Sequence, residues 1–169
     1  WKGPRAGQTW GARHYFDLLP RAAAELHPSG TYYPGSPYSG SIDLPANADN
    51  HGCRHIWDVW NEVGYSVYAD YAPRFVSEFG WQAPPTRGTL SEAISDDPIT
   101  PTSPGILHHQ KATDGNLKLA RGIEAEFGPQ SNFDDWHFAS QLVQARAIAF
   151  GISHMRALAP HCMGAIVWQ

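Results

Sequence analysis

The sequence lacks long apolar runs and dense runs of basic residues. No apolar stretch approaches the roughly 20 residues that a membrane-spanning helix needs, and the chain does not open on a signal-like segment. The 12 Lys and Arg residues are outnumbered by 16 Asp and Glu residues, which gives a net charge of -4. A protein without a basic patch has no electrostatic footprint for a polyanion. We therefore expect neither nucleic acid nor a membrane to be a partner of this chain.

Cysteine is scarce as well. The sequence holds 2 cysteines, Cys53 and Cys162, which lie far apart. Two such residues make no disulfide framework, and a single bridge is neither required nor excluded. A reducing compartment is the default for this pattern, so we expect a cytoplasmic location.

Aromatic side chains, in contrast, are abundant: 7 Trp, 7 Tyr and 7 Phe among 169 residues. Several of the tryptophans lie beside Gly, His, Asp or Gln instead of inside apolar periods. Aromatic rings stack on the C–H faces of sugars, so this clustering favours a carbohydrate site. The alternative for any single Trp or Tyr is that it fills the core of one globular domain, for which the chain is long enough.

Hydrophobic periodicity predicts an α/β fold. Helical spacing of apolar residues indicates helices at 12–26, 61–72, 90–94, 115–127 and 134–158. Apolar and β-prone runs indicate strands at 31–34, 54–60, 75–78 and 162–168. Thr89 and Asn132 are the expected N-caps of the third and the last helix. Short apolar strands that alternate with helices are typical of a parallel sheet.

Two polar groupings raise the question of a metal site without supporting one. The acidic loop 41–52 lacks the ligand spacing and the closing Glu of a calcium-binding loop. His108 and His109 are adjacent, so their side chains diverge on a strand and on a helix alike. We expect no metal and no cofactor, and at most one of these histidines as a polar group that lines a pocket.

Chemistry-bearing residues gather where the predicted strands end. They are Ser36, Tyr38, Trp57, Trp60, Glu78, Trp81, Trp168 and Gln169. Active sites of parallel α/β folds are built at this edge of the sheet. Glu78 is the most informative of them, because a carboxylate beside Phe79 and Trp81 is costly to bury unless it is paired or reactive. An ordinary structural Glu at a strand end is the alternative.

Several segments carry a family resemblance: His55–Trp60, Pro73–Gln82, Pro101–Pro104 with Leu107–Lys111, and Gly164–Gln169. In this order they resemble the catalytic domain of the β-mannosidases of glycoside hydrolase family 2, over nearly the whole chain. The Ser-Glu-Phe-Gly piece is shared across that family. The His-x-Trp-x-Val-Trp and His-His-Gln-Lys pieces favour β-mannosidase over β-galactosidase or β-glucuronidase. The Ala, Arg, Gly and Pro content also resembles that of a bacterial protein.

The resemblance implies a partial (β/α)8 TIM barrel, in which residues 1–169 run from about helix 4 to strand 8. It further implies retaining hydrolysis of terminal β-D-mannose residues in β-mannosides, with Glu78 as the nucleophile that forms a covalent glycosyl-enzyme intermediate. The implied substrate-binding residues are His55, Trp57, Trp60, Trp81 and Trp168. For each of these aromatic residues the alternative is a buried residue that packs behind the site without contacting the sugar.

The second carboxylate of that family, an acid/base Glu in an Asn-Glu pair at strand four, has no match in this sequence. Asn61-Glu62 follows the strand-six-like Trp60 and does not correspond to it. We expect the acid/base before Trp1, in a longer multidomain protein. The remaining half of the barrel and the flanking β-domains are then the partners of this chain, and the isolated chain is expected to be an inactive fragment, at best a weak sugar-binding surface.

Overall fold

The computed structural model describes residues 11–168, so the predicted role of Gln169 at a strand end and most of the first loop lie outside the described residues. The helices are α1 (Leu19–Leu26), α2 (Asp58–Asn61), α3 (Arg87–Ala93), α4 (Pro104–His109), α5 (Gly115–Phe127) and α6 (Phe133–Ala157). A π-helical turn (His14–Leu18) leads into α1, and a 3-10 helix, η2, spans Tyr65–Asp70. The strands are β1 (Arg54–Ile56), β2 (Val76–Phe79) and β3 (Ala165–Val167).

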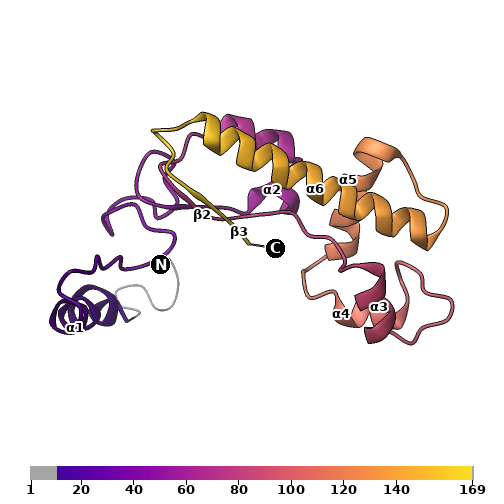
Figure 1. Ribbon diagram of the computed structural model, residues 1–169, viewed down its shortest axis with the longest axis horizontal. Coiled ribbons are helices and arrows are strands. Elements are labelled where there is room, and N and C mark those ends of the chain that lie inside the picture. The colour runs from indigo at the N-terminus through magenta and orange to yellow at the C-terminus, as the bar shows by residue number, and fades with distance from the viewer. Residues whose placement is uncertain (1–10, 169) are drawn as a thin grey trace.

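The strands form one small parallel sheet with the order β1-β2-β3. Figure 1 shows β2 and β3 side by side in this sheet. The predicted parallel sheet in a mixed α/β fold is therefore confirmed. The register contains one irregularity: Arg54 pairs with Val76 and His55 with Glu78, so β2 carries one more residue than β1 between these pairs. That additional residue is Ser77. A bulge of this kind turns side chains out of simple alternation, and bulges are common beside active sites.

Helix α6 and η2 cover one face of the sheet and form the main core. Val76 and Phe79 of β2 and Ala147 of α6 are fully buried, and Val143 of α6 is nearly so. A Cβ added at Gly151 of α6 would lie 2.7 Å from Cε2 of Phe79, so the helix backbone approaches the ring too closely for any larger residue. This close packing fixes the position of β2, which carries Glu78, relative to α6.

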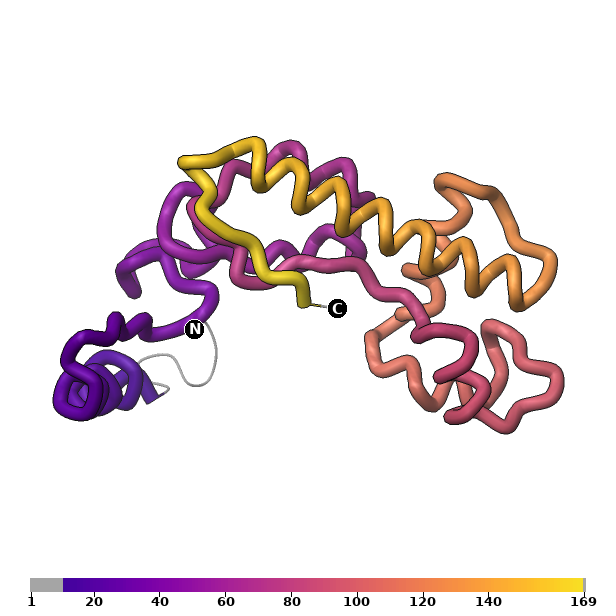
Figure 2. The backbone as a smooth tube through the Cα atoms, in the orientation of Figure 1, coloured from indigo at the N-terminus to yellow at the C-terminus, as the bar shows by residue number. Residues whose placement is uncertain are grey.

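The same helix also reaches a second core at the opposite end of the molecule. The 25 residues of α6 span roughly 37 Å at 1.5 Å per residue. As Figure 2 shows, the N-terminal half of α6 lies beside α5 and above α3 and α4. The buried residues there are Leu90, Ile94, Ile106, Leu119, Ile123, Phe133, Trp136 and Ala139. The predicted cap is confirmed, since the Asn132 side chain accepts from the backbone N–H of Asp135 at 2.9 Å.

Two predictions for the segment before β2 are wrong. The strand expected at 54–60 ends at Ile56, because the chain turns at Trp57 into α2 and Trp60 takes a left-handed φ of 73°. The helix expected at 61–72 is reduced to the short 3-10 helix η2. Local apolar content suggested longer elements than this tight turn allows.

Two further details differ from the sequence prediction. Residues 31–34 form no strand; the nearest pairing is an isolated antiparallel bridge between Tyr38 and Cys53. Helix α3 starts earlier than expected, and its N-cap is Thr86, whose side chain accepts from the backbone N–H of Thr89. None of the helices between residues 11 and 168 combines the length and the hydropathy of a membrane-spanning segment.

Candidate active site

Glu78 lies at the carboxyl end of the central strand, directly opposite His55 of β1. His55 Nδ1 is 3.2 Å from Glu78 Oε2. Trp57, which follows β1, donates from its indole Nε1 to the same oxygen at 3.1 Å. The Glu78 side chain is 25% exposed and that of His55 is 13% exposed. The structure thus brings together three of the residues predicted from the sequence, and it leaves the carboxylate accessible.

Further hydrogen bonds fix the position of His55. Its backbone N–H donates to Asn47 Oδ1 and its carbonyl accepts from Asn47 Nδ2, both at 2.7 Å. Its ring Nε2 lies 2.7 Å from Ser36 Oγ, and Ser36 Oγ is also 2.7 Å from Ser77 Oγ. Ser36 was singled out in the sequence only by its place at a predicted strand end, and Asn47 by its acidic loop. Neither signal revealed that both hold the same histidine.

The turn after β1 is held from α5. Asn61 donates from Nδ2 to the carbonyl of Trp57 at 2.6 Å, and its Oδ1 accepts from Lys118 Nζ at 2.8 Å. Arg121 donates to the carbonyl of Trp60 at 2.5 Å, and Lys118 Nζ lies 5.1 Å from the centroid of the Trp60 ring. Two cations of α5 therefore hold the turn that follows Trp57, one through Asn61 and one at the carbonyl of Trp60.

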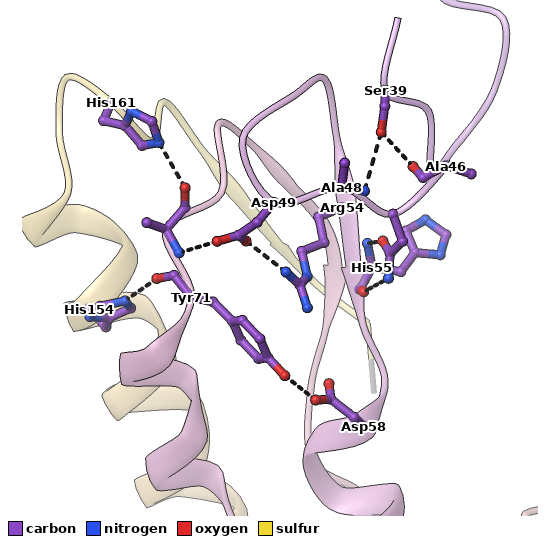
Figure 3. Close-up of polar contacts among 12 residues, drawn as sticks. Ser39, Ala46, Ala48, Asp49, Arg54, His55, Asp58, Tyr71, His154 and His161 are labelled. Atoms are coloured by element: carbon purple, nitrogen blue, oxygen red, sulfur yellow. Dashed lines mark hydrogen bonds and ion pairs between the residues drawn. The ribbon is translucent and has the colours of Figure 1, made fainter. Parts of the chain in front are cut away.

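A second polar network lies on the other side of β1 (Figure 3). Arg54 donates to Asp49 Oδ1 at 2.8 Å, and its guanidinium carbon lies 3.9 Å from the centroid of the Tyr71 ring. The Tyr71 hydroxyl donates to Asp58, and the Tyr71 carbonyl accepts from His154 at 2.7 Å. Burial and the neighbouring Asp58 carboxylate raise the pKa of Tyr71 to about 12. This network ties the acidic loop and the segment after η2 to β1.

The other predicted sugar-binding tryptophans are not joined to Glu78 by a hydrogen bond. Trp60 is 6% exposed and Trp81 is 3% exposed, and both belong to the main core. Trp81 packs edge-on against Tyr65, at 5.9 Å between ring centroids. Their burial fits the alternative of packing support, and a sugar-binding role for either stays a prediction.

Trp168 follows β3 at the same edge of the sheet. Its backbone N–H donates to the carbonyl of Phe79 at 2.8 Å. Phe79 is the residue that follows Glu78 in the sequence. Its side chain is 53% exposed. The exposed aromatic ring is accessible at this position, no described contact links it to Glu78, and its sugar-binding role stays a prediction.

Within residues 11–168 no second carboxylate hydrogen-bonds with Glu78 or its partners Trp57 and His55. Glu62, of the Asn-Glu pair set aside above, is exposed at the end of α2. No group of three or more His, Cys, Asp or Glu residues in the described part of the chain could hold a metal ion. His108 and His109 are exposed on α4, and His109 lines a pocket with Gln82 and Leu90.

The chain has relatives among proteins of known name and structure. No family model matches the chain. β-Mannosidase B of Emericella nidulans is 30% identical over 166 residues, covering 94% of this chain and 19% of that protein. β-Mannosidase B of Aspergillus flavus is 29% identical over the same coverage. The crystal structure of a β-D-mannosidase from Dictyoglomus thermophilum superposes with a TM-score of 0.89 at 33% identity, covering 95% of this chain and 20% of that one.

The predicted resemblance to β-mannosidases is confirmed. It extends over nearly the whole chain in sequence and in structure. The chain spans about a fifth of the length of these β-mannosidases, at 19% and 20% of the respective proteins. These relatives therefore leave the activity of this chain and the roles of its individual residues to be inferred from the geometry above.

Proposed function

We propose that this chain is a segment of a larger retaining β-mannosidase and supplies its nucleophile, Glu78. The observation that carries the proposal is the placement of an accessible carboxylate at the carboxyl edge of parallel strands, with His55 and Trp57 on one of its oxygens. Such donors orient a carboxylate without covering it. A residue held in this way suits attack on a sugar better than it suits a purely structural ion pair.

In the proposed reaction Glu78 acts twice. A carboxylate oxygen bonds to the anomeric carbon while the bond from that carbon to the leaving oxygen breaks, and the leaving oxygen takes a proton from the acid/base. Water then attacks the same carbon, gives its proton to the acid/base and releases the Glu78 carboxylate. The two inversions leave the β configuration of mannose unchanged. The acid/base in this proposal lies outside the chain.

The proposed domain is the second half of a (β/α)8 barrel, from about helix 4 to strand 8. Among the described residues β1 and β3 each pair only with β2, which leaves an open edge on both sides of the sheet. Ile166, Val167 and Trp168 of the β3 edge are exposed. A barrel removes such edges by closing the sheet on itself. The rest of the barrel and the flanking β-domains are accordingly the proposed partners.

Trapping of the covalent intermediate tests the proposed function. A 2-deoxy-2-fluoro-β-mannoside with an activated leaving group slows release of the sugar more than its transfer to the enzyme. The full-length protein is incubated with this reagent, digested and analysed by mass spectrometry. The sugar is expected on the peptide that contains Glu78, and a label on any other carboxylate would contradict the assignment.

The choice of sugar is tested separately. β-Galactosidase and β-glucuronidase are the alternatives within the same glycosidase family. Galactosides differ from mannosides in configuration at C2 and C4, and glucuronides differ from them at C2 and in the carboxylate at C6. Aryl β-mannoside, β-galactoside and β-glucuronide are assayed side by side with the full-length protein. The proposal expects kcat/KM to be highest for the mannoside, and a higher value for either other sugar would reject the mannosidase assignment.

A further inference from the structure

The two oxygens of Glu78 have different surroundings. Oε2 is within hydrogen-bonding distance of His55 Nδ1, at 3.2 Å, and of Trp57 Nε1, at 3.1 Å. Within residues 11–168, no hydrogen bond or ion pair reaches Oε1. An oxygen that accepts two hydrogen bonds has its lone pairs engaged, whereas its partner keeps its lone pairs for a reacting atom. Oε1 is therefore the oxygen that is free to attack.

We propose that Ser36 is a positioning residue that fixes this division by acting through His55. The inference rests on the proposed function, in which Glu78 is the nucleophile, and it adds a residue to that site. Ser36 lies on the loop between α1 and β1 and, among the described residues, makes no hydrogen bond to Glu78. Its Oγ lies 2.7 Å from Nε2 of His55, the ring nitrogen opposite the one that faces Glu78.

Contacts on both sides of the imidazole determine its orientation. Asn47 holds the backbone of His55 through two hydrogen bonds of 2.7 Å. Ser36 holds the far edge of the ring and is itself held by Ser77 Oγ at 2.7 Å. Without the Ser36 hydroxyl, the ring keeps its backbone anchor but loses the contact that sets its rotation. Nδ1 would then no longer be directed at one oxygen of Glu78.

The bulge in β2 explains why Ser77 can take part. In a regular strand Ser77 and Glu78 would point to opposite faces of the sheet. The additional residue in β2 breaks that alternation, and Ser77 instead reaches the Ser36 hydroxyl on the His55 side. The hydroxyl of Ser77 also donates to the carbonyl of Arg54 at 3.3 Å. The chain of contacts from Ser36 thus ends on the backbone of the neighbouring strand.

The direction of these hydrogen bonds has a consequence for His55. The Arg54 carbonyl only accepts, so Ser77 donates to it and Ser36 donates to Ser77. Ser36 Oγ then has its lone pairs available to Nε2 of His55, which places Nδ1 of the same ring 3.2 Å from Oε2 of Glu78. The contact from Nδ1 occupies Oε2 and leaves Oε1 as the attacking atom.

The test compares variants in the full-length protein. Ser36→Ala removes the hydroxyl, and Ser36→Thr keeps it as the conservative rescue. Ser41→Ala is the matched control, because Ser41 lies on the same loop and its side chain bonds only to Asp43 among the described residues. For each variant we measure the rate constant for trapping by the 2-fluoro-mannoside, and kcat and KM on an aryl β-mannoside.

Ser36→Ala is expected to lower the trapping rate constant and kcat about tenfold, which is about 1.4 kcal/mol of activation free energy, while KM changes less than twofold. Ser36→Thr and Ser41→Ala are expected to stay within about threefold of the wild type. A Ser36→Ala enzyme that is trapped at Glu78 as fast as the wild type would overturn the inference. A wild type that is not labelled at Glu78 would instead reject the proposed function. If Ser36→Ala does not fold, Ser36→Cys, with its much weaker hydrogen bond, replaces it with the same two outcomes.

Discussion

His55 and Glu78 lie opposite each other on neighbouring parallel strands, with 3.2 Å between Nδ1 and Oε2. They are 23 residues apart in the sequence, and the bulge at Ser77 brings them into register. The contact ties the chemistry of the site to the pairing of β1 with β2. Any change that shifts this register would therefore move the carboxylate and its partner together.

Trp57 is expected to contribute through its indole N–H as well as its ring. Trp57→Phe keeps an aromatic ring but removes the donor to Glu78 Oε2. A hydrogen bond to a charged group is worth about 1.5–3 kcal/mol, so kcat should fall roughly 10- to 100-fold. Steady-state kinetics of the full-length variant on an aryl β-mannoside measure this.

Trp60→Phe is the matched control for that experiment. The indole Nε1 of Trp60 is buried and has no hydrogen-bond partner among the described residues. If Trp60 only packs in the core, as its burial indicates, loss of this N–H should leave kcat within a few-fold of the wild type. Equal losses in the two variants would show that the Trp57 N–H has no special role.

Asn61 is expected to link stability with activity. Asn61→Ala removes the hydrogen bond to the Trp57 carbonyl and the acceptor for Lys118. The loss of one such bond costs about 1 kcal/mol, so the melting temperature should fall, and kcat should fall several-fold as Trp57 loses its support. Glu62→Ala, at the exposed neighbouring position, should change neither quantity. A normal kcat in Asn61→Ala would show that the turn held by Asn61 does not affect catalysis through Trp57.

Tyr71 is expected to make the folding stability of the protein decrease at alkaline pH. Its pKa is raised to about 12 in the folded state by burial and by the Asp58 carboxylate, against the ordinary value of 10.0. Between these values the unfolded chain loses the phenol proton while the folded chain keeps it. Folding stability should therefore be intact below pH 10 and fall as the pH rises from 10 to 12.

Thermal melts of the full-length protein and its Tyr71→Phe variant measure the effect. Phenylalanine has no proton to lose, so the melting temperature of the wild type should decline more steeply than that of the variant over this range. Parallel declines would indicate that Tyr71 titrates as an ordinary tyrosine.

The sequence predicted the parts of the fold that depend on local pattern. The capped helix α6 and the short apolar strands follow from the Asn132 cap and from periodic apolar residues. Glu78 and Trp57 follow from their places at strand ends, and His55 follows from the family resemblance. The parts that were missed depend on tertiary contacts. The early end of β1 requires the left-handed Trp60, which is stabilised by cations from α5.

Two features of the site could not be read from the sequence for physical reasons. Aromatic residues serve equally for sugar stacking and for core packing, so Trp60 and Trp81 could not be separated from Trp57 before their burial was known. Ser36 lies in a loop and reaches His55 only because the chain folds back across β1. Nothing in the residues around a loop serine indicates that its hydroxyl will contact a distant histidine.

Glu78 as the nucleophile is tested most directly by chemical rescue of Glu78→Ala in the full-length protein. Azide can enter the space left by the carboxylate and attack the anomeric carbon from the same side. An activated aryl β-mannoside should then be hydrolysed only negligibly without azide, and with azide it should give the α-mannosyl azide. The stereochemistry of the product is read by NMR. Near-normal hydrolysis without azide, or a β-mannosyl azide as the product, would contradict the assignment.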